Sequence, residues 1–126
     1  MFVRNNNSYW LTTGMFPQEL TIQFQQAQVV NEVRFVSTGV KKVAIEGCQT
    51  ANGNGFKVIG ESREIPANRG QRQSESVAID QPSSYIMIKF VITEGWEDFA
   101  SVHNIQVVWY ASMQHEAPEH HQTNYI

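Results

Sequence analysis

The sequence contains one cysteine, Cys48, and has no surplus of cationic residues. A single cysteine cannot form a disulfide within the chain, which suits a reducing compartment. Lysine and arginine number 9 against 12 aspartate and glutamate residues, so the formal net charge is −3. The sequence therefore lacks the basic stripe that is typical of nucleic-acid and anionic-membrane contacts. We expect neither nucleic acid nor a lipid surface as a partner.

Long hydrophobic segments are also missing. No apolar run approaches the ~20 residues that a membrane-spanning helix needs. The first residues, MFVRNNNS, lack the apolar stretch of a secretory signal. These absences predict a soluble, cytoplasmic protein without direct membrane insertion. A chain of 126 residues fits one domain, and it buries enough surface to fold without disulfides or a structural metal.

Apolar and polar residues alternate along most of the chain. In ELTIQF, residues 19–24, the alternation places Leu20, Ile22 and Phe24 on one face, as in a half-buried strand. The most apolar segment, SSYIMIKFVIT at residues 83–93, predicts a central strand. Its expected core face consists of Ile86, Ile88, Phe90 and Ile92, opposite Tyr85, Met87 and Lys89.

Glycine, proline and asparagine separate the strand patterns, and no segment has the period of a capped helix. Residues 61–74 are polar and predict an exposed loop. Seven short strands joined by turns predict an all-β fold, an antiparallel β-sandwich or jelly roll. We expect this domain to cover residues 1–110. Residues 111–126 are polar and aperiodic, which predicts a flexible C-terminal tail.

Residues 10–24 follow the pattern W-x-T-x-G-x-x-P-x-x-L-x-I-x-F. Gly14 allows a backbone conformation that a side chain would block. Pro17 lacks an N–H donor and fits the entry to a strand. Met15 and Phe16 at the tip have two interpretations, a lid over the core or an exposed apolar tip that docks a partner. The lid is favoured for Phe16.

A second loop, EGWEDFAS, combines acidic and aromatic residues. Its carboxylates could suggest a glycosidase, but one loop rarely supplies both acids at the separation that this chemistry requires. An exposed Trp96 flanked by charge is typical of an interface anchor. We therefore predict no catalytic residues, and a partner-binding site that consists of Met15, Phe16, Glu94, Trp96, Asp98 and Phe99.

The histidines offer no stronger site. His103 has no nucleophile motif beside it, so we expect it to form hydrogen bonds at the end of the last strand. His115, His120 and His121 lie in the polar tail with no cysteine near in sequence, whereas zinc needs a fixed set of ligands. We expect neither a metal centre nor enzymatic activity.

Two stretches, TTGMFPQE at residues 12–19 and FASVH at residues 99–103, resemble the paired signatures of the intraflagellar transport protein 25 family. This family belongs to the galactose-binding-domain-like jelly rolls, and the resemblance runs from Tyr9 to Tyr110. It implies a non-enzymatic adaptor in a complex B-like ciliary assembly, at the cilium, flagellum or basal body. It also implies a hetero-oligomer with a Rab-like small GTPase and other ciliary transport subunits.

Two departures from the family pattern concern the N-terminus. Family members have a further strand before the tryptophan. Here that strand is absent, supplied by a partner, or represented by MFVRNN. The calcium loop of the family, Asp-Gly-x-x-x-Thr-x-Trp, is degenerate, because Asn5, Asn7 and Ser8 offer neutral ligands where calcium usually takes carboxylates. We expect no cofactor and little or no calcium binding.

Two alternatives to the transport adaptor stay open. One is a structural component of a stable axonemal or basal-body complex, in which a partner strand completes the jelly roll. The other is a carbohydrate-binding module, with Trp96 as an aromatic platform beside Asp98.

Overall fold

The computed structural model describes residues 10–13, 15–80, 82–97, 99–110 and 121–125. These residues form eight strands, and all their pairings are antiparallel, which confirms the all-β antiparallel expectation. The strands are β1 (Trp10–Thr13), β2 (Gln18–Thr38), β3 (Val40–Cys48), β4 (Lys57–Glu61), β5 (Gln73–Ala78), β6 (Ser84–Gly95), β7 (Phe99–Tyr110) and β8 (His121–Tyr125). Within the described residues, no helix is long and apolar enough to cross a membrane.

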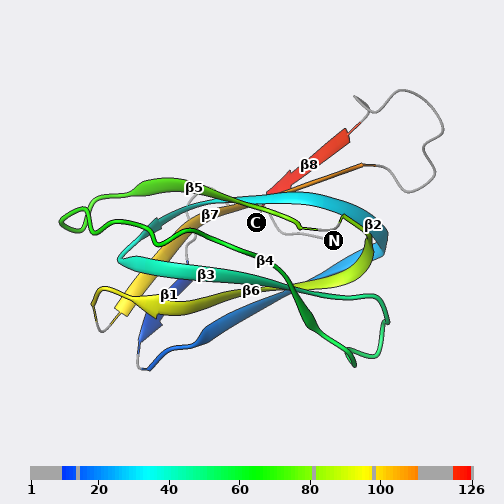
Figure 1. The fold of residues 1–126 in the computed structure, drawn as a ribbon, viewed down its shortest axis with the longest axis horizontal. Coiled ribbons are helices and arrows are strands. Elements are labelled where there is room, and N and C mark those ends of the chain that lie inside the picture. The colour runs from blue at the N-terminus through cyan, green and yellow to red at the C-terminus, as the bar shows by residue number, and fades with distance from the viewer. Residues whose placement is uncertain (1–9, 14, 81, 98, 111–120, 126) are drawn as a thin grey trace.

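Strand β2 belongs to both layers of a sandwich (Figure 1). Its first part, from residue 18 to residue 23, pairs with β6, which continues to β3 and β4. From residue 29 onward it pairs with β7, and residues 32–37 also pair with β5. The sequence predicted a short strand at residues 19–24. The chain instead bends through an irregularity between Gln23 and Gln28 and continues for 21 residues without leaving the extended conformation.

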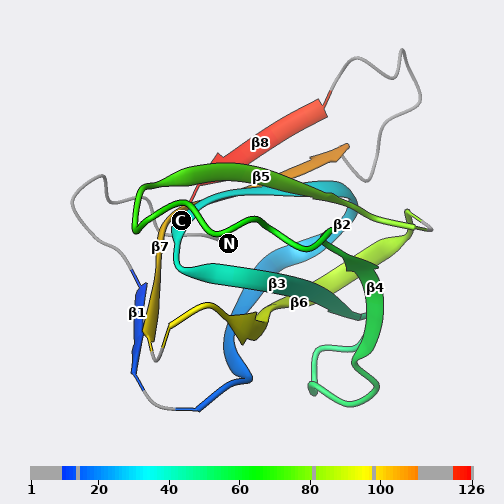
Figure 2. The ribbon, with the colours of Figure 1, turned by 60° about the vertical axis from the view of Figure 1, so that its left-hand side comes forward.

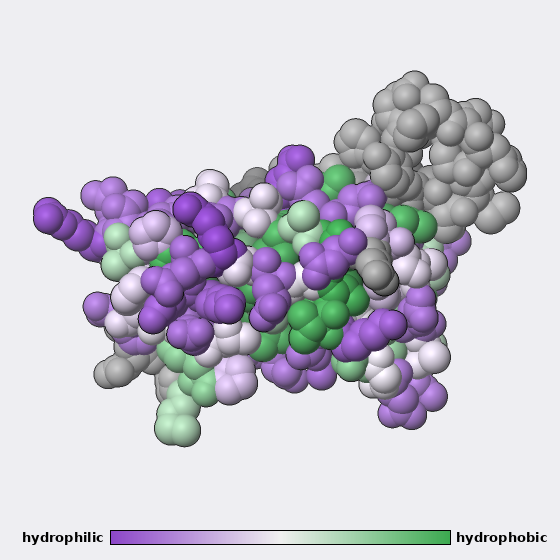
Figure 3. All heavy atoms as spheres, in the orientation of Figure 1, coloured by the Kyte–Doolittle hydropathy of each residue, from purple (hydrophilic) through white to green (hydrophobic). Residues whose placement is uncertain are grey.

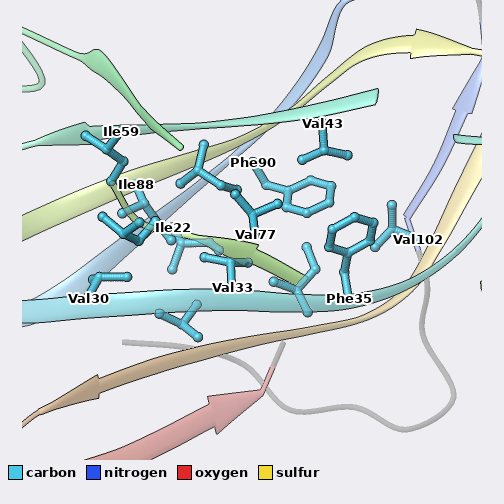
Figure 4. Close-up of a cluster of buried hydrophobic side chains, with 14 of the residues drawn as sticks. Ile22, Val30, Val33, Phe35, Val43, Ile59, Val77, Ile88, Phe90 and Val102 are labelled. Carbon is cyan, nitrogen blue, oxygen red and sulfur yellow. The ribbon is translucent and has the colours of Figure 1, made fainter. Parts of the chain in front are cut away.

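The hydrophobic core lies between the two layers (Figure 4). The rings of Phe35 in β2 and Phe90 in β6 meet edge to face, with centroids 5.0 Å apart. Ile22 and Phe24 are buried, as the alternation in residues 19–24 predicted. Aromatic rings in this edge-to-face arrangement stabilise a core beyond the effect of their buried area.

Strand β6 follows the predicted alternation only in part. Ile88, Phe90 and Ile92 are fully buried in the core, as expected. Tyr85 also lies in the core, whereas Ile86 is only half-buried, so the expected faces are wrong at this end of the strand. The exchange occurs opposite the irregularity in β2, where the pairing register shifts between Gln23 and Gln28. A bulge of this kind changes which side chains face inward.

The segment from residue 111 to residue 126, predicted as a flexible tail, contains β8, which pairs with residues 106–110 of β7. The sequence predicted no strand at residues 121–125, and the division of the chain at residue 110 stays a prediction. HQTNY shows no apolar alternation, and backbone hydrogen bonding to the edge of β7 is not visible in side-chain patterns. The N-terminal strand question and the degenerate calcium loop at Asn5, Asn7 and Ser8 lie outside the described residues.

Residues 62–72 form an arm between β4 and β5, where the sequence predicted a loop (Figure 2). Backbone hydrogen bonds from Ser62 to Val43 and from Ile65 to Lys41 hold its first part along β3. A tight turn closes its tip, with Arg69 and Gly70 at φ 53° and 75°. Two successive positive φ angles are the mark of a type I′ turn. The arm is therefore held by contacts with β3 that could not be predicted from its polar sequence.

Candidate functional site

The two loops singled out in the sequence meet at one end of the sandwich. Met15, Phe16, Glu94 and Trp96 line a common surface hollow, together with Lys41, Thr93, Gly95 and Glu97. The β1–β2 connection supplies the first pair and the end of β6 with its following loop supplies the second. Of the other predicted site residues, Asp98 lies outside the described residues, and Phe99 begins β7, where it pairs with Thr13.

Met15 and Phe16 have different environments although they are adjacent. Met15 is 85% exposed. Phe16 is half-buried and packs against the core, so the favoured lid interpretation is confirmed for this residue. Gly95 makes room for the ring, since a Cβ atom built there would lie 2.5 Å from Phe16 Cζ. The Gln18 side chain donates a hydrogen bond of 2.8 Å to the Met15 carbonyl, which holds the exposed tip.

Trp96 is 41% exposed but is held in place on several sides. Its indole N–H donates a 2.8 Å hydrogen bond to the Ile65 carbonyl of the arm. Its backbone N–H donates to the Gly39 carbonyl at 2.9 Å. Lys41 Nζ lies 4.7 Å from the ring centroid, a cation–π distance, and 3.7 Å from a carboxylate oxygen of Glu94. A large aromatic group fixed before a partner arrives loses little side-chain entropy on binding.

A second hollow adjoins the first, and Trp96 and Glu97 border both. Its remaining lining comes from the β2–β3 turn, the arm and the start of β7, and includes Ser37, Thr38, Gly39, Asn68, Arg69 and Ser101. Lys41 and the arm were not predicted from the sequence as parts of this end of the molecule. Lys41 is far from Trp96 along the chain, so only the pairing of β3 with β6 brings the two together.

His103 in β7 forms the hydrogen bonds that the sequence suggested. Its Nε2 atom lies 3.2 Å from Thr38 Oγ1 and 3.0 Å from Ser101 Oγ. Burial and, to a smaller extent, the positive charge of Arg72 lower the pKa of His103 below its ordinary value of 6.5. The neutral imidazole therefore serves as a polar link between β2 and β7.

The part of the chain that the structure describes contains no group of three or more His, Cys, Asp or Glu residues placed to hold a metal ion. Of the tail histidines, His115 and His120 lie outside that part, and His121 begins β8. The expectation about calcium stays a prediction.

Comparison with curated sequences finds intraflagellar transport protein 25 and homologs of it. Intraflagellar transport protein 25 of Chlamydomonas reinhardtii is 35% identical over 104 residues, which cover 82% of this chain and 53% of that protein. The Homo sapiens homolog is 32% identical over 102 residues, covering 80% of this chain and 69% of that protein. The Mus musculus homolog is 30% identical over 101 residues, with the same coverage. The chain thus spans about half the length of the Chlamydomonas relative. No protein-family model matches the sequence.

Comparison with solved structures finds the same fold in carbohydrate-binding modules. A CBM32 module of Clostridium perfringens in complex with GalNAc-β-1,3-galactose has a TM-score of 0.67 at 19% identity, covering 82% of this chain and 76% of that one. The family 32 module of Clostridium perfringens NanJ, in complex with galactose, has a TM-score of 0.62 at 21% identity, covering 82% and 77%. At these identities the likeness establishes the galactose-binding-like jelly roll and nothing about ligands.

Proposed function

The chain belongs to the intraflagellar transport protein 25 family, and from this membership we propose that it acts in intraflagellar transport as a non-enzymatic interaction subunit. Its partners in this proposal are a Rab-like small GTPase and other subunits of a complex B-like assembly, with which it forms a hetero-oligomer. Its place is the cilium, flagellum or basal body. The names of its relatives support the transport role. The pairing with a GTPase rests on the resemblance of residues 12–19 and 99–103 to the family signatures.

The observation that carries the docking site is the side-by-side position of an exposed Met15 and a fixed Trp96 on one hollow. A methionine adapts to a partner surface because its side chain is flexible and polarisable. A tryptophan supplies a rigid anchor, and tryptophan is among the commonest hot-spot residues in interfaces. Lys41 and Glu94 form an ion pair at 3.7 Å and line the same hollow as this apolar pair. We assign docking to Met15, Glu94 and Trp96, with Phe16 as the packed base of the tip, and the sequence adds Asp98 and Phe99 to this proposal.

Binding to a purified ciliary Rab-like GTPase tests this assignment. We expect Met15→Ala and Trp96→Ala each to weaken binding by roughly tenfold or more, the loss typical of hot-spot residues. Val58→Ala is the matched control, because Val58 is a large apolar residue that is 54% exposed on β4, outside the hollow. Failure of the unsubstituted chain to bind any such GTPase would refute the partner. Equal losses in the control and in the two site variants would refute the site.

A carbohydrate-binding module is the second candidate, favoured by the aromatic Trp96 beside the second hollow, whose lining includes Asn68, Arg69 and Ser101. The indole N–H of Trp96 is already bonded to the Ile65 carbonyl, and Lys41 lies over its ring, which leaves less of the ring for a sugar to stack on. A glycan array distinguishes the two, since the adaptor proposal expects no bound glycan. The alternative of a stable axonemal or basal-body component predicts retention of the chain in detergent-extracted axonemes, where a transport subunit is released.

A further inference from the structure

The β3–β4 loop contains two asparagine–glycine pairs in succession, Asn52-Gly53 and Asn54-Gly55. Both asparagines are exposed. Asparagine followed by glycine is the sequence in which the backbone most readily attacks the side-chain amide, because glycine places no side chain in the way. The two pairs share this sequence context, so any difference in their reactivity comes from the structure around them.

Hydrogen bonds hold the side chain of Asn52. Its Oδ1 atom accepts from the backbone N–H of Asn54 at 3.0 Å and from the Thr50 hydroxyl at 2.8 Å. The backbone N–H of Gly53, the group that would attack, donates to the Thr50 carbonyl at 3.4 Å. Both the electrophile and the nucleophile of this pair are therefore engaged, and these bonds must break before a ring can close.

Asn54 is held only through its backbone. Its carbonyl oxygen lies 2.9 Å from Thr50 Oγ1 and accepts from the thiol of Cys48 at 3.1 Å. Among the described residues, no hydrogen bond restrains its side-chain amide or the N–H of Gly55. Gly55 has φ +88°, and nothing lies within 4 Å of the position where its Cβ would be. The pair has a free electrophile, a free nucleophile and open space for ring closure.

We propose that Asn54 is a site of spontaneous deamidation and that Asn52 is protected from it. The Gly55 nitrogen attacks Asn54 Cγ, the bond from Cγ to the side-chain nitrogen breaks, and ammonia leaves as the succinimide forms. Water then opens the ring at either carbonyl and gives aspartate or isoaspartate. No oxidant, cofactor or enzyme takes part, so water is the only co-reactant.

The β3–β4 loop, in which this modification occurs, covers the outer face of β3 and β6. The loop lies over the buried Cys48, and a Cβ built at Gly53 would lie 3.7 Å from Met87 Cε. Deamidation adds a negative charge to a chain with net charge −3. Isoaspartate also routes the backbone through the former side chain, which displaces the carbonyl that accepts from Cys48. The β3–β4 loop and the β1–β2 connection, which contributes Met15 and Phe16 to the docking hollow, lie at opposite ends of the molecule (Figure 1), so this inference does not depend on the proposed function.

Peptide mapping by mass spectrometry, with enzymatic labelling of isoaspartate, tests the proposal on the full chain during incubation in mildly alkaline buffer. We expect Asn54 to deamidate about tenfold faster than Asn52. The hydrogen bonds that restrain Asn52 must break before its ring closes, and this slows the reaction by about that factor. In strong denaturant the two rates should become similar. Thr50→Val, which removes the hydroxyl bonded to Asn52, should raise the rate at Asn52 in the folded chain. Conversion of Asn52 at the rate of Asn54 or faster in the folded chain would overturn the proposal, as would an unchanged ratio in denaturant.

Discussion

The contact between Phe16 and Gly95 predicts that Gly95→Ala changes the stability of the chain in opposite directions with and without the Phe16 ring. An alanine Cβ at Gly95 would lie 2.5 Å from Phe16 Cζ and 2.6 Å from Cε2. Carbon atoms in ordinary contact are about 3.5–4.0 Å apart, so the ring must move by roughly 1 Å. Overpacking of this size costs about 1–3 kcal/mol. Gly95 is not among the glycines with positive φ, so alanine fits its backbone conformation.

The same substitution should have the opposite effect once the ring is removed. Replacing glycine by alanine in a compatible conformation stabilises by roughly 0.4–1 kcal/mol, because the unfolded chain loses freedom. We expect Gly95→Ala to destabilise the chain, and to be neutral or stabilising when added to Phe16→Ala. The Gly39 carbonyl oxygen, 3.3 Å from the built Cβ, is a second close neighbour and reduces the gain.

A double-mutant cycle by urea denaturation measures this coupling. The free energy of unfolding is compared for the unsubstituted chain, both single variants and the double variant, with the denaturant dependence used to check that each unfolds in the same way. A coupling of about 1–3 kcal/mol is expected from the overpacking alone. Equal destabilisation by Gly95→Ala in both backgrounds would show that Phe16 does not pack on Gly95, and would refute the lid.

Two further predictions concern the core and pH. Phe35→Ala should lower the free energy of unfolding by about 3–5 kcal/mol, because the ring is buried against Phe90 and its removal leaves a cavity; a loss below about 1 kcal/mol in denaturant titration would contradict the packing. The lowered pKa of His103 means that the unfolded chain binds its proton more readily, so stability from this group is complete above pH 6.5 and declines as the pH falls through that value. His103→Gln should flatten this part of the stability–pH curve measured by denaturation, and an unchanged slope would show that another group titrates there.

Side-chain alternation was enough to predict the fold class and part of the core. Ile22, Phe24, Ile88 and Phe90 are buried as expected, because a period of two places alternate side chains in the core. The continuity of β2 through both layers could not be predicted in this way. Its middle, QQAQVV at residues 25–30, has no turn residue and no clear alternation, and the bend is absorbed by a shift in pairing register.

Part of the candidate site could also be predicted from the sequence, and part could not. The sequence marked both loops, and the structure brings Met15, Phe16, Glu94 and Trp96 together. The sequence favoured the lid for Phe16, but it could not predict the space for the ring, because that space comes from Gly95 on another strand. The arrangement of Lys41 over Trp96 likewise depends on strand pairing between distant residues.

Figure 3 shows how polar and apolar residues are distributed over one face of the molecule. Most of the face drawn there is hydrophilic; the largest apolar area lies near its middle, and smaller ones lie at the lower left and the upper right. Exposed large apolar residues in the described part of the chain are limited to Met15, Val58 and Trp96. Dispersed apolar residues of this kind favour recognition at defined anchor points over broad hydrophobic contact.

The pairing of β1 has a consequence for the newly made chain. In the described structure its partner is β7, with Trp10 opposite Val102 and Thr13 opposite Phe99. A ribosome must therefore synthesise nearly the whole domain before the first strand can join a sheet. Topologies closed by such distant pairings fold slowly, because the chain entropy is lost before the contacts form. During translation the tryptophan-bearing segment stays without its final partner, so this domain reaches its native state only at the end of its own synthesis.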